Sequence, residues 1–387
     1  MQSGLSSPIL ASILLRALEG ETLSREDALA LISADPAPVR AAAGQLRDRL
    51  KGRRITYSRK VFLPVTNLCR DRCSYCTFRK SPRHPEAHTM TPEEIRASSS
   101  RGFQAGCKEA LMCLGDRPEA VYPGYRERLR LLGHATTPEY VLEACHIALE
   151  EGLLPHTNAG VLTGEEMQRL RPVNVSMGLM LENVSPRLSR KGQAHAAAPD
   201  KDPALRLAMI EAAGELRIPF TTGILLGIGE TLEERVDTIL AIRELHARHG
   251  HIQEVIVQAF RAKPDTPMRE HSQSSDQELA HTVAVTRLVL GGMNVQAPPN
   301  LSPEGHVLLL ESGINDWGGI SPVTRDYINP EAPWPHLETL ARTCARSGFE
   351  LGERLAIYPE YLNARSFLDP GLNQAVEAVQ ERMPVRV

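Results

Sequence analysis

The sequence predicts an α/β fold, a TIM-type (β/α) barrel with seven or eight repeats of a strand followed by a helix. Short apolar runs alternate with helical patterns along most of the chain, and this alternation is typical of a parallel sheet. The 387 residues would fill two or three domains of about 150 residues, but such barrels reach this length as one unit. No linker rich in Pro or Ser interrupts the pattern. We therefore expect one barrel domain (51–345) between an N-terminal helical extension (1–50) and a C-terminal extension (346–387).

The first expected element is an N-terminal amphipathic helix over the apolar run 8–16. A secretory signal is the alternative, but no basic residue precedes the run and Arg16 cuts it short. No stretch approaches the roughly 18 apolar residues of a membrane span. A net charge of −3 and 4% aromatic residues argue against a nucleic-acid surface. With free thiols and no export signal, we expect a cytoplasmic protein.

Eight apolar segments are the expected strands, and segments with helix-capping signals separate them. Thr91, Thr137 and Thr163 are each followed by Glu within one helical turn, which is typical of an N-cap. Barrels place functional groups in the loops after the carboxyl ends of their strands. The polar residues directly after the strands are therefore candidates for one shared site. The expected strands are 61–65, 109–114, 154–158, 173–181, 220–226, 254–260, 294–297 and, more weakly, 317–321.

The loop after the first expected strand contains the most informative motif, Cys69-x3-Cys73-x2-Cys76. Three closely spaced thiolates suit a soft metal centre, and iron–sulfur clusters are held by cysteine thiolates. A 4Fe–4S cluster normally has four such ligands, whereas the next cysteine, Cys107, lies 31 positions further on. With three protein ligands, one iron would keep an open position for a small molecule. An open metal site indicates chemistry rather than a structural role.

Two other interpretations of the cysteines are weaker. A structural zinc site would need a fourth ligand, such as His84, His88 or Cys107, but the second ligand pair usual in zinc loops is missing. A disulfide framework fits poorly, because seven cysteines are an odd number and a chain of this length can bury its own core. The other four cysteines, Cys107, Cys113, Cys145 and Cys344, are expected to be small buried hydrophobic residues.

The cysteine loop, with Tyr75 as the aromatic residue before its last cysteine, resembles the radical S-adenosylmethionine (SAM) superfamily. The resemblance implies that Cys69, Cys73 and Cys76 hold a 4Fe–4S cluster and that SAM chelates the fourth iron. It also implies SAM contacts at further positions. These are Gly115 and Asp116 near the methionine amino group, Glu182 at the ribose, Arg206 at the methionine carboxylate, and Gly227 in the strand-five motif near the adenine.

Longer segments are similar to a narrower family, the CofG-type subunits of FO synthase. They are 61–79, 113–119, 314–322 and 329–335. This resemblance covers the chain from about residue 50 to beyond 360. It implies formation of 7,8-didemethyl-8-hydroxy-5-deazariboflavin (FO), the chromophore of coenzyme F420. A 5′-deoxyadenosyl radical would abstract hydrogen from a hydroxybenzyl–ribitylaminouracil adduct, and ring closure with loss of ammonia would follow.

The resemblance implies partners as well as cofactors: a second, CofH-type subunit that supplies the adduct, and an electron donor such as ferredoxin or flavodoxin. The Lys- and Arg-rich stretch 51–83 is either a docking rim for an acidic electron carrier or a solvated face.

The substrate contacts are the least certain part of the site. Asn158, Asn300, Asn315 and Asp316 fall in loops at the expected mouth of the barrel, where each is a candidate contact or a loop-stabilising residue. Two alternatives for the whole chain stay open. One is a radical SAM enzyme with a different small substrate, as in the biotin, menaquinone or thiamine pathways, and the other is a non-catalytic iron–sulfur or zinc protein.

Overall fold

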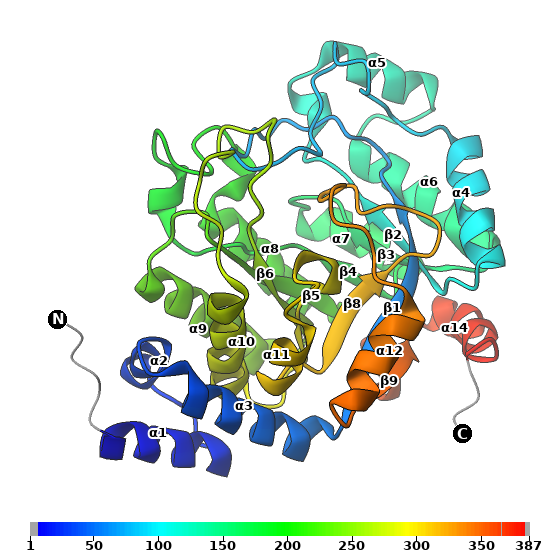
Figure 1. Ribbon diagram of the computed structural model, residues 1–387. Coiled ribbons are helices and arrows are strands. Elements are labelled where there is room, and N and C mark those ends of the chain that lie inside the picture. The colour runs from blue at the N-terminus through cyan, green and yellow to red at the C-terminus, as the bar shows by residue number, and fades with distance from the viewer. Residues whose placement is uncertain (1–6, 365, 384–387) are drawn as a thin grey trace.

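Eight parallel strands form a closed barrel in the computed structural model, which describes residues 7–364 and 366–383 (Figure 1). Consecutive strands are neighbours from β2 to β8, β8 pairs with β1, and a pairing of β1 with β2 closes the ring. The predicted barrel is thereby confirmed. Its strands are β1 (Arg54–Leu63), β2 (Glu109–Cys113), β3 (Leu154–Asn158), β4 (Ser176–Gly178), β5 (Phe220–Leu226), β6 (Ile252–Ala259), β7 (Val295–Gln296) and β8 (Asp316–Ile320).

A ninth strand, β9 (Glu350–Arg354), joins the barrel from the region expected to be a C-terminal extension. It pairs with the first half of β1, from Arg54 to Ser58, whereas β2 pairs with the second half, from Lys60 to Leu63. The chain then continues under the barrel, where the carbonyl oxygen of Ala356 accepts hydrogen bonds from Ser176 Oγ and Gln253 Nε2. The segment after β9 therefore helps to close the amino-terminal end of the barrel.

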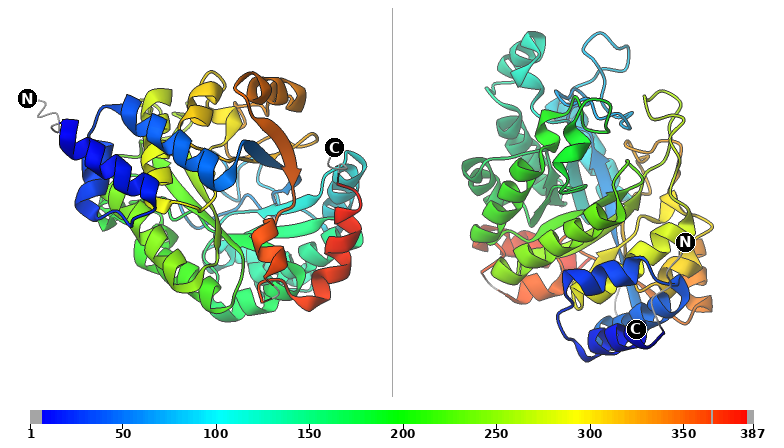
Figure 2. Two further views of the ribbon diagram at one scale, coloured as in Figure 1. Left: turned by 90° about the horizontal axis from the view of Figure 1, so that it is seen from below. Right: turned by 90° about the vertical axis from the view of Figure 1, so that its left-hand side faces the viewer.

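Helices cover the outside of the barrel, and α2 and α3 of the N-terminal region pack on α9, α10 and α11 (Figure 2). The α-helices are α1 (Ser7–Glu19), α2 (Arg25–Ile32), α3 (Pro36–Lys51), α4 (Pro92–Gln104), α5 (Pro123–Leu131), α6 (Thr137–Glu150), α7 (Gly164–Leu170), α8 (Pro203–Glu215), α9 (Leu232–His249), α10 (Asp276–Leu290), α11 (His306–Glu311), α12 (Leu337–Arg346), α13 (Pro359–Asn363) and α14 (Asn373–Gln380). Among the residues that the structure describes, none of the helices combines the length and apolar character needed to cross a membrane.

Capping boxes fix where the helices begin. Thr91 and Thr163 cap α4 and α7, as their sequences predict. The prediction for Thr137 was wrong by one residue: Thr136 is the N-cap of α6, and its hydroxyl accepts a hydrogen bond from the Glu139 backbone. Thr137 instead donates its hydroxyl to Glu119, because it already belongs to the first turn.

Candidate active site

The three clustered cysteines line a cavity at the carboxyl end of the barrel strands, in the loop after β1. This upper cavity has a volume of about 310 Å³. A second loop, which leads into α8, holds the cysteine loop in place: the backbone N–H of Arg72 donates to Ala197 and that of Ser74 to Ala194, both at 2.9 Å. The Arg70 guanidinium also pairs with Asp200. These contacts fix the cysteine loop against the loop that leads into α8.

The donor set fits an iron–sulfur cluster. Burial raises the pKa of the Cys73 thiol to about 12 and that of Cys69 higher still, so neither ionises at neutral pH without a cation beside it. A metal core would replace those protons and compensate the buried thiolates. Cys107 lies just before β2, at the opposite end of the strand from the cysteine loop, and is no candidate for a fourth ligand. The three predicted metal residues therefore line one cavity, and Cys107 does not join them.

Gly115 and Asp116, directly after β2, lie against the first cysteine. A Cβ atom on Gly115 would stand 2.2 Å from the Leu68 carbonyl oxygen, so only glycine permits this approach. The Asp116 backbone N–H donates to Cys69 Sγ at 3.0 Å. Asp116 is buried, and its Oδ1 atom has no hydrogen-bond partner among the described residues. An unpaired buried carboxylate oxygen fits a cationic group of a ligand, such as an amino group.

Glu182 and Arg206 line the same cavity, as the sequence predicts, together with Lys201, which it did not. Glu182 has a left-handed backbone with φ of 62°, and its carboxylate accepts a hydrogen bond from Lys201 Nζ at 2.6 Å. Arg206 Nε donates to the Asp200 carbonyl oxygen at 2.9 Å, and the guanidinium also contacts Met180 O. Two cations and a carboxylate thus stand on the side of the cavity formed by β4 and α8.

Tyr75 also lines the cavity, whereas Gly227 does not. The Tyr75 hydroxyl hydrogen-bonds His195 Nε2 at 3.1 Å, a contact that no sequence motif indicates. Gly227 has φ of 84°, and its N–H donates to Glu230 Oε1 at 2.9 Å. A Cβ on Gly227 would lie 2.9 Å from Ser274 Oγ, so this glycine is required by the turn after β5. Its direct contact with a ligand is not supported by the geometry.

Comparisons with known proteins show the family of this chain. The sequence pattern of the Radical SAM superfamily matches residues 63–242. The chain is 48% identical to the 7,8-didemethyl-8-hydroxy-5-deazariboflavin synthase of Methanopyrus kandleri, over 84% of this chain and 98% of that protein. It belongs to the deazariboflavin synthase family of radical SAM proteins.

Members of the deazariboflavin synthase family differ in length. The chain is also 48% identical to the FO synthase of Nocardia farcinica, over 95% of this chain but only 44% of that longer protein. Among solved structures, HydG, a maturase of the FeFe hydrogenase, matches with a TM-score of 0.76 and 17% identity, covering 99% of this chain and 91% of that one. At this identity the likeness to HydG shows the fold alone.

In this member of the deazariboflavin synthase family, Asn158 lines the upper cavity, but three other expected substrate contacts do not. The Asn300 amide donates to Asp326 Oδ2 at 2.9 Å. Asn315 Oδ1 accepts from Arg287 and from the Val295 backbone, at 2.6 and 2.9 Å. These two side chains thus connect loops and strands of the scaffold instead of lining the upper cavity, although Asn300 Oδ1 has no hydrogen-bond partner among the described residues. A substrate contact at either residue stays a prediction.

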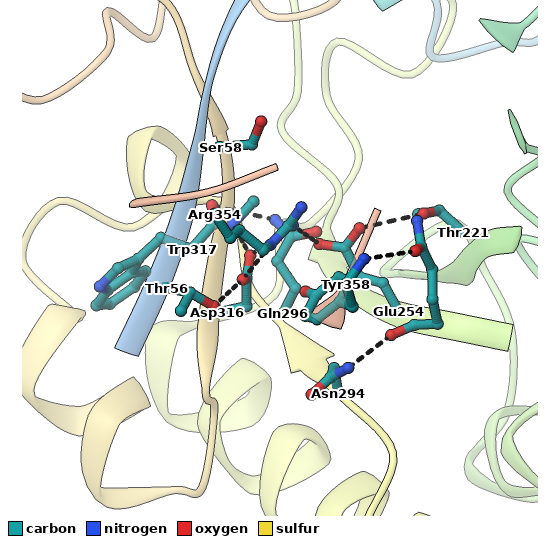
Figure 3. Close-up of polar contacts among 12 residues, drawn as sticks. Thr56, Ser58, Thr221, Glu254, Asn294, Gln296, Asp316, Trp317, Arg354 and Tyr358 are labelled. Carbon is teal, nitrogen blue, oxygen red and sulfur yellow. Dashed lines mark hydrogen bonds and ion pairs between the residues drawn. The ribbon is translucent and has the colours of Figure 1, made fainter. Parts of the chain in front are cut away.

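Asp316 was also expected at the mouth of the barrel, but it begins β8 and lies at the opposite end. Its carboxylate pairs with Arg354, which reaches from the end of β9 between Asp316 and Glu254 (Figure 3). The N–O distances are 2.6 Å to Asp316 and 2.8 Å to Glu254. Asp316 is therefore the partner of a buried arginine rather than a mouth residue. Its position one residue before the expected strand gave no sign of this.

Proposed function

We propose that this chain forms FO from 5-amino-5-(4-hydroxybenzyl)-6-(D-ribitylimino)-5,6-dihydrouracil, a step in making coenzyme F420. The observation that carries the proposal is the 48% identity to a protein named deazariboflavin synthase, across 98% of that protein. The site supports it, because the three cysteine thiols share one cavity with Gly115, Asp116, Glu182 and Arg206, four of the residues that the radical SAM resemblance assigns to SAM. The reaction would be that of an ammonia-releasing carbon–nitrogen lyase.

The residues that would hold the cofactors are present in the upper cavity. Cys69, Cys73 and Cys76 would hold a 4Fe–4S cluster. With SAM bound, the cluster would supply a radical able to abstract hydrogen from carbon. The Oδ1 atom of Asp116, which has no partner among the described residues, would accept a hydrogen bond from the amino group of SAM.

The opposite side of the upper cavity would receive the rest of SAM. Lys201 and Arg206 add positive charge where a carboxylate would bind, and Glu182 would accept hydrogen bonds from ribose hydroxyls. Apolar walls that include Leu179 and Leu225 would keep water from a reactive intermediate.

Two kinds of partner follow from the proposed function. The longer relatives leave room for a second activity in the same protein, so the shorter form would receive its adduct from a separate subunit. An electron carrier such as ferredoxin or flavodoxin would dock near the cysteine loop, where Arg72 and Arg83 are exposed. Lys60, from the same basic stretch, is excluded from this surface because it points into the barrel and pairs with Glu109 at 2.8 Å.

The test is product analysis under anaerobic conditions. The reconstituted protein is reduced and given SAM and the adduct, and FO is identified by its fluorescence and mass. Wild-type protein and a Cys145→Ala control should form FO, because Cys145 is buried outside the cavity. Cys73→Ala should form none. Formation of 5′-deoxyadenosine without FO would instead indicate a radical enzyme with another substrate.

A further inference from the structure

The upper cavity adjoins a deeper chamber inside the barrel. This lower chamber has a volume of about 180 Å³ and shares Phe62, Leu111, Asn158 and Ile256 with the wall of the upper cavity. Polar side chains from six strands and from the end of β9 surround it. They include Lys60, His156, Glu254, Gln258, Gln296 and Arg354.

Packing alone does not account for this polar interior. Barrel interiors are ordinarily filled by layers of Val, Ile and Leu, and apolar replacements of buried ion pairs are often neutral or stabilising. Here Arg354, Asp316 and Glu254 form a nearly buried cluster (Figure 3). The Lys60–Glu109 pair is nearly buried as well. The charges of Lys60 and Glu109, and of Arg354 and Glu254, are paired within the protein. The Asp326 carboxylate, which also lines the chamber, accepts hydrogen bonds from the Asn300 and Asn329 amides. The chamber therefore suits a neutral ligand rich in hydrogen-bonding groups.

Some hydrogen-bonding capacity in the lower chamber is unused. Ser176 Oγ donates to the Ala356 carbonyl oxygen, so it accepts a hydrogen bond from His156 Nδ1 at 2.7 Å. The Nε2 atom of His156 is then left as an acceptor. Burial lowers the pKa of His156 to about 4, which keeps the ring neutral. The Gln258 amide makes no side-chain hydrogen bond with any described residue, although it lines both spaces.

The walls change in character from the lower chamber to the upper cavity. Leu179, Leu225 and Phe260 line the upper cavity only, beside the cysteines. A ligand with one polar end and one aromatic end would therefore be oriented along the barrel axis, with the aromatic end toward the cysteine loop.

We propose that the lower chamber binds the ribityl–pyrimidine end of the adduct, with His156 Nε2 and the Gln258 amide among its contacts. This inference rests on the proposed function and adds the substrate-binding residues to it. The hydroxybenzyl end then lies in the upper cavity, nearer the cysteines. A neutral polyhydroxylated heterocycle is the class of ligand that the chamber recognises.

The test uses two fluorescent probes, FO and the same deazaflavin ring with methyl in place of the ribityl chain. Dissociation constants are measured by anaerobic fluorescence titration of the reconstituted full chain. Wild-type protein should bind FO at least about tenfold more tightly than the methyl analogue, since each hydrogen bond to the chain contributes about that factor or somewhat less. Gln258→Leu and His156→Leu should each weaken FO binding by up to about tenfold and weaken analogue binding less.

His251→Leu is the matched control, because His251 is buried outside the chamber and hydrogen-bonds the Ile210 carbonyl oxygen. It should leave both dissociation constants unchanged. Gln258→Leu breaks no internal side-chain hydrogen bond, so its binding result does not depend on a damaged fold. Equal affinity of wild-type protein for the two probes, or unchanged FO affinity in both chamber variants, would overturn the proposal. Failure of the proposed function would show separately, as SAM cleavage by wild-type protein without FO.

Discussion

Gly115 links the end of β2 to the cysteine loop more tightly than any side chain would allow. We predict that Gly115→Ala pushes the loop outward, since its Cβ would lie 2.2 Å from Leu68 O and 2.5 Å from Cys69 Cβ. Overpacking of this kind lowers the free energy of unfolding by about 1–3 kcal/mol. Here it would also displace Cys69, one of the three proposed cluster ligands. Iron content and cluster absorbance after anaerobic reconstitution should fall well below the wild-type values. Gly124→Ala is the control, because nothing lies within 4 Å of its Cβ.

Glu254 should make stability depend on pH. Burial and the Asp316 charge raise its pKa to about 7, although Arg354 opposes this. Between pH 4.5, the pKa of this carboxyl in the unfolded chain, and about 7, the folded protein binds more protons at Glu254 than the unfolded chain does. The contribution of Glu254 to the free energy of unfolding is therefore fully present at low pH and is lost as pH rises through about 7. We predict that the free energy of unfolding of wild-type protein, relative to Glu254→Gln, falls between pH 5 and 8, by at most about 1.4 kcal/mol per pH unit.

The measurement for Glu254 is urea denaturation of the cluster-free protein across that pH range. Glu234→Gln is the control. The Arg187 guanidinium lowers the pKa of Glu234 to about 2, so its contribution is constant above pH 5. A flat difference for Glu254→Gln, or an equal slope in both variants, would show that Glu254 does not titrate in this range.

Single residues were predictable where the chemistry is local in sequence. The cysteine motif, Asp116, Glu182 and Arg206 were all expected in one site, and the structure brings them together. Lys201 and His195 were missed because the packing of loops brings them to Glu182 and Tyr75, and no residue spacing in the sequence shows this packing. Asn315 and Asp316 were misplaced for a related reason: the sequence does not show that scaffold contacts already occupy their polar groups. Scaffold contacts also engage the Asn300 amide nitrogen, whereas its Oδ1 atom has no partner among the described residues.

At the scale of elements, β9 contributes Arg354, the cation that pairs with the buried carboxylates of Asp316 and Glu254 inside the barrel. Arg354→Met would leave Asp316 and Glu254 buried without their partner, and breaking such a pair typically costs about 3–5 kcal/mol. We predict that urea denaturation shows this decrease in the free energy of unfolding for Arg354→Met. The decrease should be smaller for Arg354→Lys, because lysine keeps the positive charge but lacks the planar guanidinium. Arg346→Met, on the exposed surface of α12, should change stability by no more than about 0.5 kcal/mol. Equal stability of Arg354→Met and Arg346→Met would contradict this account.

Sequence reasoning missed the strands that are rich in charged or polar residues. All eight expected segments overlap a strand, but β1 begins at Arg54 rather than near residue 61. The first half of β1 alternates polar and apolar residues, and β9 has charged residues at Glu350, Glu353 and Arg354. These charged side chains form ion pairs with neighbouring strands. A search for apolar runs does not detect such strands. Only the pairing of distant segments, Arg54 with Glu350 for example, defines them.

At the scale of the whole molecule, the closed barrel places two different environments on one axis. The cysteine loop and SAM-type residues lie at the carboxyl end of the strands, and the polar lower chamber lies beneath them. The same closure would keep a radical and its target together and away from solvent. Barrel closure was predictable from the strand–helix alternation, whereas the polar floor was not, since it depends on residues from β1, β6, β8 and β9 meeting in space.

The central claim is that this chain carries the ring-closing half of FO synthesis. In the most direct measurement, the reconstituted chain is reduced and mixed with SAM. It then receives either the purified adduct or the two precursors of the adduct, tyrosine and the ribitylaminouracil. We predict FO and 5′-deoxyadenosine from the adduct, and no FO from the precursors until a second subunit is added. Failure to convert the adduct while SAM is cleaved, or FO formation from the precursors by this chain alone, would contradict the claim.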